Sequence, residues 1–154
     1  MHKVRLRNAV PEDAQHLARI HRSARAAAMP WLPVLHSPEE DIRFFAQQVL
    51  PSHSVHIAAC GNAIAGFIAV DQDWINHLYI SPDHWRQGIG TVLLRHAMRG
   101  STVLRLWTFQ RNNAARAFYT GHSFKEVGCT DGADNEERTP DVRMEWTRDA
   151  RPPS

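Results

Sequence analysis

Hydrophobic and polar residues follow two periods along the chain, and the segments they define occur in the order βααβββαβαββ. Alternating or near-continuous apolar residues predict seven strands, at residues 3–7, 54–60, 63–70, 74–80, 102–109, 124–129 and 142–146. Apolar residues at helical spacing predict about four helices, which begin near Pro11, Ser37, Gly88 and Ala114. One strand–helix–strand unit at residues 74–109 predicts a parallel pair within a mostly antiparallel sheet. The pattern indicates an α+β fold, a twisted mixed sheet flanked by helices.

Local signals refine this pattern. Ser37-Pro38-Glu39-Glu40 has the sequence of a capping box, and we expect Pro51 to stop the helix that it opens. Gly66 lies inside a predicted strand, where it either weakens the strand or marks a close approach of another backbone. Residues 31–36 follow Pro30 and hold Pro33 among large apolar side chains. They form either a hydrophobic loop packed on the core or a lid over a substrate pocket.

Length and composition limit the class of protein. The chain has 154 residues, 43% of them hydrophobic, which is typical of a single domain, here residues 1–147, with a frayed tail at 148–154. No apolar run is long enough to span a membrane and no signal peptide is evident, so we expect a cytoplasmic protein without membrane contact. A net charge of +2 argues against a nucleic-acid partner. Ten scattered histidines lack metal-ligand spacing, so we expect no metal, and Cys60 and Cys129 are expected to be free thiols.

Residues 73–90 combine an apolar strand, a Ser-Pro turn and a loop that leads into an amphipathic helix. The first turn of a helix has free backbone N–H groups, and the helix dipole favours an anion there. Gly88 and Gly90 would let a phosphate approach the backbone because neither has a Cβ atom. The stretch therefore predicts a pyrophosphate site.

Two motifs, L-Y-I-S-P-D-H-W-R-Q-G-I-G and N-N-A-A-R-A-F-Y-T-G-H-S-F, stand in this order across the strand–helix–strand–helix unit. In this order and spacing the chain resembles the GNAT superfamily of acetyl-CoA-dependent N-acetyltransferases, from about Val4 to Trp146. The resemblance implies that acetyl-CoA lies where the strands at 74–80 and 102–109 splay apart. It implies a cofactor-binding set that comprises Leu78, Tyr79 and Ile80 for the pantetheine arm, Arg86, Gln87, Gly88, Ile89, Gly90 and Thr91 around the pyrophosphate, and Asn112, Ala115 and Phe118 on the second motif. The family has Gln or Arg where this chain has Trp85, and Arg86 would supply the charge instead.

Catalytic roles also follow from the resemblance. Tyr119 matches the tyrosine that protonates the departing CoA thiolate; the alternative is a plain core tyrosine. The family often places a glutamate on the strand at 74–80, where this chain has only Asn76 and His77 as candidates for the base. His77 would accept the amine proton directly or through water, or it is a packed histidine bonded to a neighbour. Strict alternation places His77 on one face with Ile75 and Tyr79.

The polar loop at residues 130–141 carries Glu136, Glu137 and Asp141. These acids are either solvated surface or, if the loop folds over an acceptor pocket with Trp31 and His36, an attraction for a cationic amine. The resemblance thus implies an N-acetyltransferase that uses acetyl-CoA and a primary amine in a ternary complex. The alternative is a non-catalytic acyl-CoA sensor on the same fold. The acceptor, and whether the chain forms a homodimer, are left open.

Overall fold

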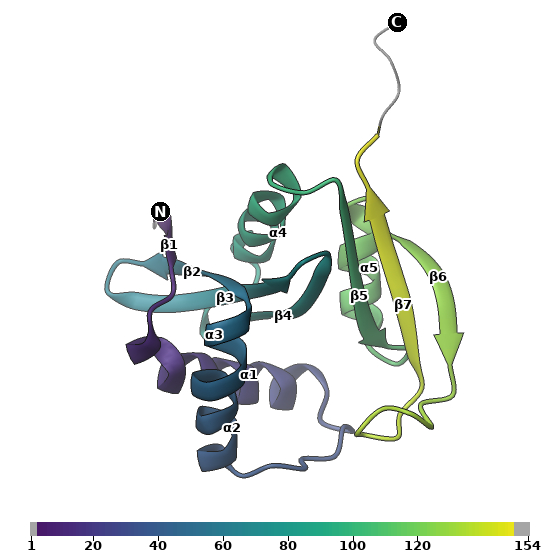
Figure 1. Cartoon of the computed structure of the whole chain (residues 1–154), viewed down its shortest axis with the longest axis horizontal. Helices are drawn as coiled ribbons and strands as arrows, with labels where there is room; N and C mark the ends of the chain where they lie inside the picture. Colours follow the sequence, from purple (N-terminus) through teal and green to yellow (C-terminus); the bar gives the residue numbers. More distant parts are fainter. Residues whose placement is uncertain (1–2, 150–154) are drawn as a thin grey trace, which may run out of the picture.

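The chain folds around a seven-stranded mixed sheet with the order β1-β2-β3-β4-β5-β7-β6, seen in a computed structural model that describes residues 3–149 (Figure 1). The strands are β1 (Val4–Asn8), β2 (Ser54–Cys60), β3 (Ala63–Asp71), β4 (Trp74–Ile80), β5 (Val103–Phe109), β6 (Lys125–Thr130) and β7 (Asp141–Thr147). All neighbouring strands are antiparallel except β4 and β5, which are parallel. The predicted fold class is confirmed.

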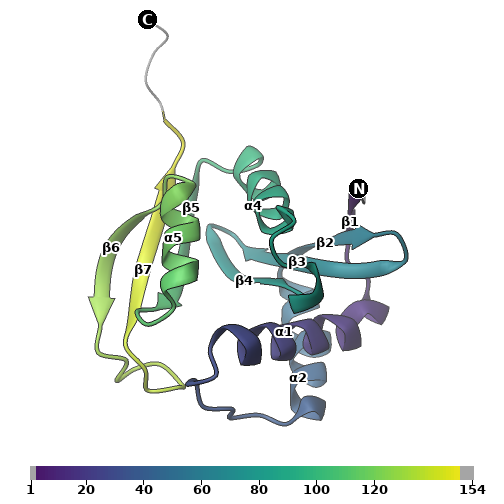
Figure 2. The ribbon, with the colours of Figure 1, turned by 180° about the vertical axis from the view of Figure 1, so that it is seen from behind.

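Helices cover both faces of the sheet (Figure 2). They are α1 (Ala14–Ala28), α2 (Pro38–Phe44), α3 (Leu50–Ser52), α4 (Ile89–Arg99) and α5 (Asn113–Gly121), with short η1 (Pro11–Asp13), η2 (Phe45–Val49) and η3 (Pro82–His84). α1 and the α2–η2 segment pack with β2 and β3 in one hydrophobic cluster, which includes Leu17, Phe45 and Phe67. α4 and α5 pack on the other face in a second cluster, with Leu93 and Tyr119 among its members. Each face of the sheet therefore has its own core.

The expectation that Pro51 stops the second helix is wrong. The predicted capping box at Ser37 is present, and the helical path runs on through α2, η2 and α3 to Ser52. The η2 segment is a π-helix in which the N–H of Leu50 donates to the carbonyl of Phe45. This wider turn changes the hydrogen-bond register just before Pro51, whose missing N–H and ring would disturb a regular α-helix at this point.

Gly66 marks a close backbone approach, one of the two alternatives that the sequence left open. A Cβ atom at Gly66 would lie 2.7 Å from the carbonyl oxygen of Tyr79 and 2.6 Å from Cδ1 of Ile80. Since both residues belong to β4, only glycine lets β3 pack this tightly against the strand that leads to the glycine loop.

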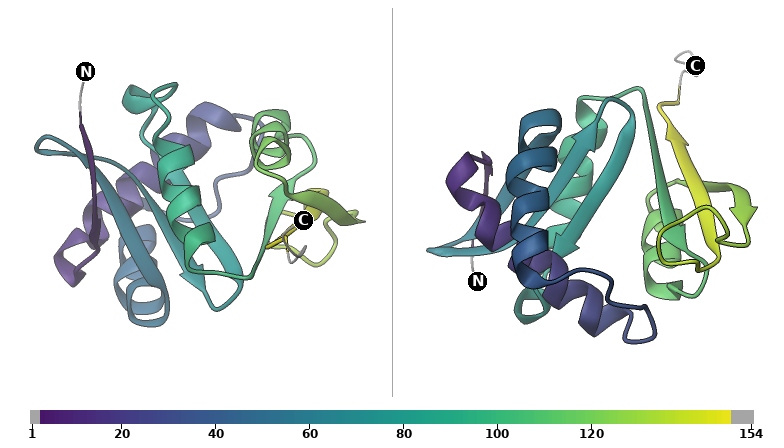
Figure 3. Two further views of the ribbon diagram at one scale, coloured as in Figure 1. Left: turned by 90° about the horizontal axis from the view of Figure 1, so that it is seen from above. Right: turned by 60° about the horizontal axis from the view of Figure 1, so that its bottom comes forward.

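The sheet divides between β4 and β5. These strands pair in register only at Trp74 and Arg105, and the Arg105 guanidinium bonds Asp73 at 3.0 Å beside that pair. Beyond this point β1–β4 and β5–β7 diverge as two blades (Figure 3). The splayed parallel pair that the resemblance implies is present.

The chain end differs in part from the expectation of a frayed tail. The N–H of Arg148 donates to the carbonyl of Thr102 at 2.7 Å, and its guanidinium donates to the carbonyl of Met98 at 2.8 Å. Residues 150–154 of the expected tail lie outside the described residues. Within residues 3–149, no helix has the length and apolar character needed to cross a membrane.

Candidate active site

The loop between β4 and α4 ends in a helix N-terminus with free donors. Gly88 is the N-cap of α4 in the left-handed conformation, at φ +77°. The first backbone bond of the helix runs from the N–H of Val92 to the carbonyl of Gly88 at 3.1 Å. The N–H groups of Ile89, Gly90 and Thr91 therefore have no acceptor within the helix and are available to an anion.

Trp85 has a defined role in this loop. Its indole Nε1–H donates to the carbonyl oxygen of Ile80 at 2.8 Å, which ties the loop to the end of β4. The neighbouring Arg86 is exposed and left-handed, at φ +65°. Gly90 faces the second motif, because a Cβ at this position would lie 3.4 Å from the ring of Phe118. The predicted loop residues are thus brought together at one helix end.

A cavity of about 110 Å³ occupies the gap between β4 and β5. It is lined by residues of both strands, by Met29 of the segment after α1, and by α5 with its N-cap Asn112. Seven of the predicted site residues line it, namely Asn76, His77, Leu78, Tyr79, Asn112, Ala115 and Tyr119. Ile80 and Phe118 lie outside its lining and instead contact the glycine loop. The gap is referred to below as the cofactor gap.

The predicted face of Ile75 is wrong. Val70 of β3 pairs with Ile75 and Ala69 pairs with His77, so Asn76 is an extra residue that makes a β-bulge. Ile75 packs in the cluster with α4, whereas the ring of His77 packs on the opposite face against Phe45 at 5.2 Å. A bulge breaks strict alternation, which is why period-two reasoning failed here.

His77 lies in an aromatic environment with little hydrogen bonding. Its ring is 5.8 Å from that of Phe44 and 5.9 Å from that of His21. Burial, with smaller contributions from the charges of His53 and Arg25, lowers the pKa of His77 to about 4. Its Nδ1 is buried and has no hydrogen-bond partner among residues 3–149. His77 is therefore neutral at pH 7, the form that a proton acceptor needs.

The second motif presents three of the predicted residues, Asn112, Ala115 and Tyr119, to the cofactor gap. Asn112 is the N-cap of α5: its Oδ1 accepts from the N–H of Ala115 at 3.2 Å, and its Nδ2 contacts Sδ of Met29 at 3.5 Å. Tyr119 is buried, with 8% of its surface exposed, and this burial raises the pKa of its hydroxyl, with a smaller effect from Tyr79. Tyr119 is therefore protonated at pH 7, the form that a proton donor needs.

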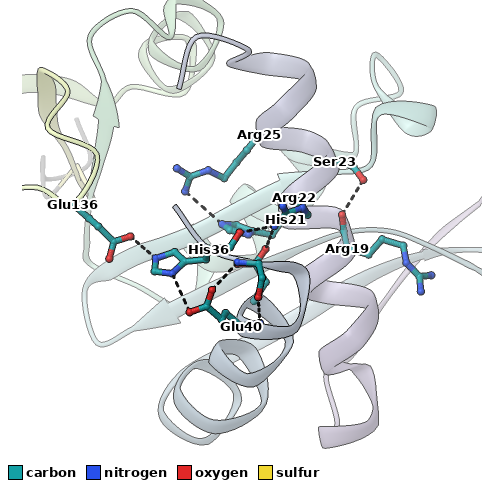
Figure 4. Close-up of polar contacts among 10 residues, drawn as sticks. Arg19, His21, Arg22, Ser23, Arg25, His36, Glu40 and Glu136 are labelled. Carbon is teal, nitrogen blue, oxygen red and sulfur yellow. Dashed lines mark hydrogen bonds and ion pairs between the residues drawn. The ribbon is translucent and has the colours of Figure 1, made fainter. Parts of the chain in front are cut away.

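A larger cavity of about 560 Å³ adjoins the cofactor gap, and Met29 and His77 line both. Its walls come from α1, α2, residues 29–36, His77 and the loop before β7, where Glu136 and Glu137 contribute. His36 Nε2 lies 2.6 Å from Glu136 Oε1, and Figure 4 shows this contact beside Glu40. This larger space is referred to below as the acceptor cavity.

The late loop therefore lines this cavity together with His36, and attraction of a cationic amine by its acids stays a prediction. Of its three acids, Asp141 does not take part, since its carboxylate bonds Thr130 and Asn135 inside the loop. Trp31 does not line the cavity either; its ring packs against Phe109 and lies under the guanidinium of Arg111.

Sequence reasoning missed several polar residues of this cavity, among them His21 and Arg25 on α1. Arg25 Nη2 bonds Glu137 Oε2 at 2.9 Å, and the rings of His21 and Tyr79 are 4.9 Å apart. Burial, with smaller contributions from Arg25, His77, Arg22 and His36, lowers the pKa of His21 to about 3. The available signal was their spacing, because Leu17, His21 and Arg25 continue one row of the helix at steps of four.

Comparison with known proteins agrees with this geometry. Residues 51–126, which contain both motifs, match the family model described as an acetyltransferase (GNAT) domain. The uncharacterized N-acetyltransferase YafP of Escherichia coli is 25% identical over 82% of this chain and 85% of its own. The uncharacterized N-acetyltransferase MJ1207 of Methanocaldococcus jannaschii is 31% identical over 44% of this chain, but the match spans only 37% of that protein's length.

Among solved structures, a PaiA N-acetyltransferase of Thermoplasma acidophilum in complex with coenzyme A superimposes with a TM-score of 0.74 at 20% identity. The similarity covers 95% of this chain and 99% of that chain. The fold, the two motifs and the sequence match agree. The family match over residues 51–126 and the curated N-acetyltransferase relatives together support a GNAT N-acetyltransferase.

Proposed function

We propose that this protein transfers the acetyl group of acetyl-CoA to a primary amine by direct attack in a ternary complex. The observation that carries the proposal is the meeting of the cofactor gap and the acceptor cavity at Met29 and His77. Direct transfer requires the thioester carbon and the amine nitrogen to be held a few ångströms apart at the same time. Two adjoining cavities, one between parallel strands and one lined by side chains, meet this requirement.

The residues around the cofactor gap suit coenzyme A. The loop at Arg86–Thr91 offers backbone N–H groups and the positive end of α4 to the pyrophosphate. Leu78 and Tyr79 lie beyond the point where β4 pairs with β5, so their backbone groups on that side are available to the amides of the pantetheine arm. The CoA complex of the PaiA relative supports this assignment.

The chemistry uses Tyr119 of the cofactor gap and His77 at the junction of the two cavities. The amine nitrogen attacks the thioester carbon, the C–S bond breaks, and the hydroxyl of Tyr119 gives its proton to the sulfur. His77, neutral at pH 7, takes the proton that the amine loses. Asn76, whose Nδ2 is 3.0 Å from Nε2 of His53, would orient a water for the same purpose. The backbone N–H near Tyr79 or Ile80 would stabilise the oxyanion.

A second candidate is a non-catalytic acyl-CoA sensor. The observation that favours it is the absence of a carboxylate from β4, Trp74–Ile80. On this reading the cofactor gap binds acyl-CoA and the late loop reports its presence to a partner.

Calorimetry and a thiol-release assay separate these functions. We expect acetyl-CoA to bind and free CoA to appear faster when an amine from a broad panel is added. Absence of binding at millimolar acetyl-CoA would overturn both functions. Binding with no acceleration by any amine would favour the sensor.

A further inference from the structure

The acceptor cavity has the size of a small-molecule site and an apolar wall. Its volume of about 560 Å³ lies within the usual range for ligand pockets, ~300–1,000 Å³. Its apolar lining comprises Ala26, Met29, Leu32, Pro33, Val34, Leu35 and Phe44. Val34, Leu35 and Phe44 are among the exposed large hydrophobic residues of the protein, at 72%, 46% and 38% exposure. An acceptor with an apolar body would cover these side chains and gain from their burial.

The arginines of the cavity are already neutralised. Arg22 Nη1 bonds Asp41 Oδ2 at 3.0 Å, and Arg25 Nη2 bonds Glu137 Oε2 at 2.9 Å. A guanidinium is the usual partner for the carboxylate of an amino-acid substrate. Because each guanidinium here has its own carboxylate, neither is a ready site for a substrate carboxylate.

The remaining charge of the lining is acidic. Glu40 and Glu136 flank His36, with carboxylate oxygens 4.0 and 2.6 Å from its ring nitrogens (Figure 4). The two carboxylates carry two negative charges, so these three side chains remain net negative even when His36 is protonated. An ammonium group is therefore attracted to the cavity, and a carboxylate is repelled.

The inner end of the cavity adds an observation of a different kind. The Nδ1 atoms of His21 and His77 are both buried and lack a hydrogen-bond partner within the described part of the chain. Buried polar atoms without a partner are uncommon, and neutral imidazoles complement the N–H groups of an amine. The amine end of the acceptor then points inward and its apolar body toward the mouth.

We infer that the acceptor is a primary amine with an apolar body and no carboxylate, and that Glu40 and Glu136 select against amino acids. This inference rests on the proposed function and names the substrate class of the same site. The discrimination against amino acids is electrostatic. The apolar wall alone would accept both an amine and the amino acid with the same apolar group.

Matched acceptors that differ by one carboxylate test the inference: phenethylamine against phenylalanine, and isoamylamine against leucine. We expect kcat/KM to favour each amine by about tenfold or more, with the methyl ester of phenylalanine close to phenethylamine. The double variant E40Q/E136Q should reduce that preference at least about threefold, whereas E39Q, an exposed acid outside the cavity, should leave it unchanged. Equal use of amine and amino acid, or an unchanged preference in the double variant, would overturn the inference.

Binding without turnover distinguishes this inference from the proposed function. Saturation-transfer NMR measures contact of phenethylamine and phenylalanine with the protein in the absence of acetyl-CoA. Selective binding of phenethylamine with no acetyl transfer would sink the proposed function and leave the inference standing. Acetyl transfer to phenylalanine at the rate for phenethylamine would overturn the inference and support the proposed function.

Discussion

The cofactor gap and the acceptor cavity adjoin each other but are built differently. The lining of the cofactor gap comes mainly from two stretches, residues 75–79 and 106–119, and depends on where two strands stop pairing. The acceptor cavity depends on side-chain pairs between segments far apart in sequence, such as His36 with Glu136 and Arg25 with Glu137. The backbone therefore sets the shape of the cofactor gap, and side chains set the shape of the acceptor cavity.

This difference predicts different responses to substitution. A change that moves the backbone at β3, β4 or the glycine loop should affect both stability and cofactor binding, because the cores on both faces rest on the same strands. A change confined to the side-chain pairs of the acceptor cavity should alter amine recognition and leave cofactor binding intact. The two regions can therefore be perturbed separately.

Gly66→Val should have the largest effect. Its Cβ would meet the Tyr79 carbonyl at 2.7 Å, so β3 and β4 must separate. We expect a loss of about 3 kcal/mol or more in the free energy of unfolding, at the upper end for overpacking, and weaker acetyl-CoA binding. Urea denaturation and calorimetry measure both. Gly128→Val on the exposed β6 is the control, since a Cβ there has no atom within 4 Å; equal losses for the two variants would contradict the close-approach argument.

Acidification should destabilise the protein because His77, which lines the acceptor cavity, is buried in its neutral form. Burial lowers the pKa of His77 to about 4 from its ordinary 6.5, so the unfolded chain binds more protons between these pH values. Stability therefore falls as the pH drops below 6.5, by about 3 kcal/mol for His77 alone at pH 4. Unfolding titrations from pH 7 to 4 should show a shallower fall for His77→Gln. The exposed His16→Gln is the control; an identical slope for the wild type and His77→Gln would show that His77 is not desolvated.

Tyr119→Phe acts inside the cofactor gap, on the departure of the thiolate. Removing the hydroxyl takes away the proton for the leaving thiolate while the ring keeps its packing against Phe124 at 5.4 Å. We expect kcat to fall about a hundredfold with little change in acetyl-CoA affinity, measured by thiol release and calorimetry. An unchanged kcat would show that the thiolate leaves without being protonated, which would exclude the general-acid role.

The backbone-built region was largely predictable from the sequence. The bounds of β2 and β4 were predicted correctly because local patterns specify strands, glycine turns and helix starts. The splay of the parallel pair was implied only by the resemblance to the GNAT superfamily. The bulge at Asn76 was not predicted, since an added residue leaves no mark on composition.

The side-chain-built region was predicted only as alternatives. The sequence offered Glu136 and Glu137 as solvated surface or as part of an acceptor pocket, and nothing local decided between them. Their partners His36 and Arg25 are 100 and 112 residues away, so the pairs form only when the late loop crosses to α1 and the segment after it. Long-range contacts of this kind follow from the whole fold.

The Arg25–Glu137 pair tests the separation of the two regions with the smallest effect. The two side chains are 23% and 16% exposed, so removing one partner leaves a partly desolvated charge, while removing both does not. We expect Arg25→Met and Glu137→Gln each to raise the KM for the amine severalfold, and the double variant to show a coupling energy of about 1 kcal/mol. Acetyl-CoA affinity should stay constant in all three variants, as measured by calorimetry. The exposed pair Arg116–Glu126, which lines neither cavity, is the matched control. Parallel losses of acetyl-CoA and amine binding would show that the late loop holds the cofactor gap together as well, and that the two regions are one.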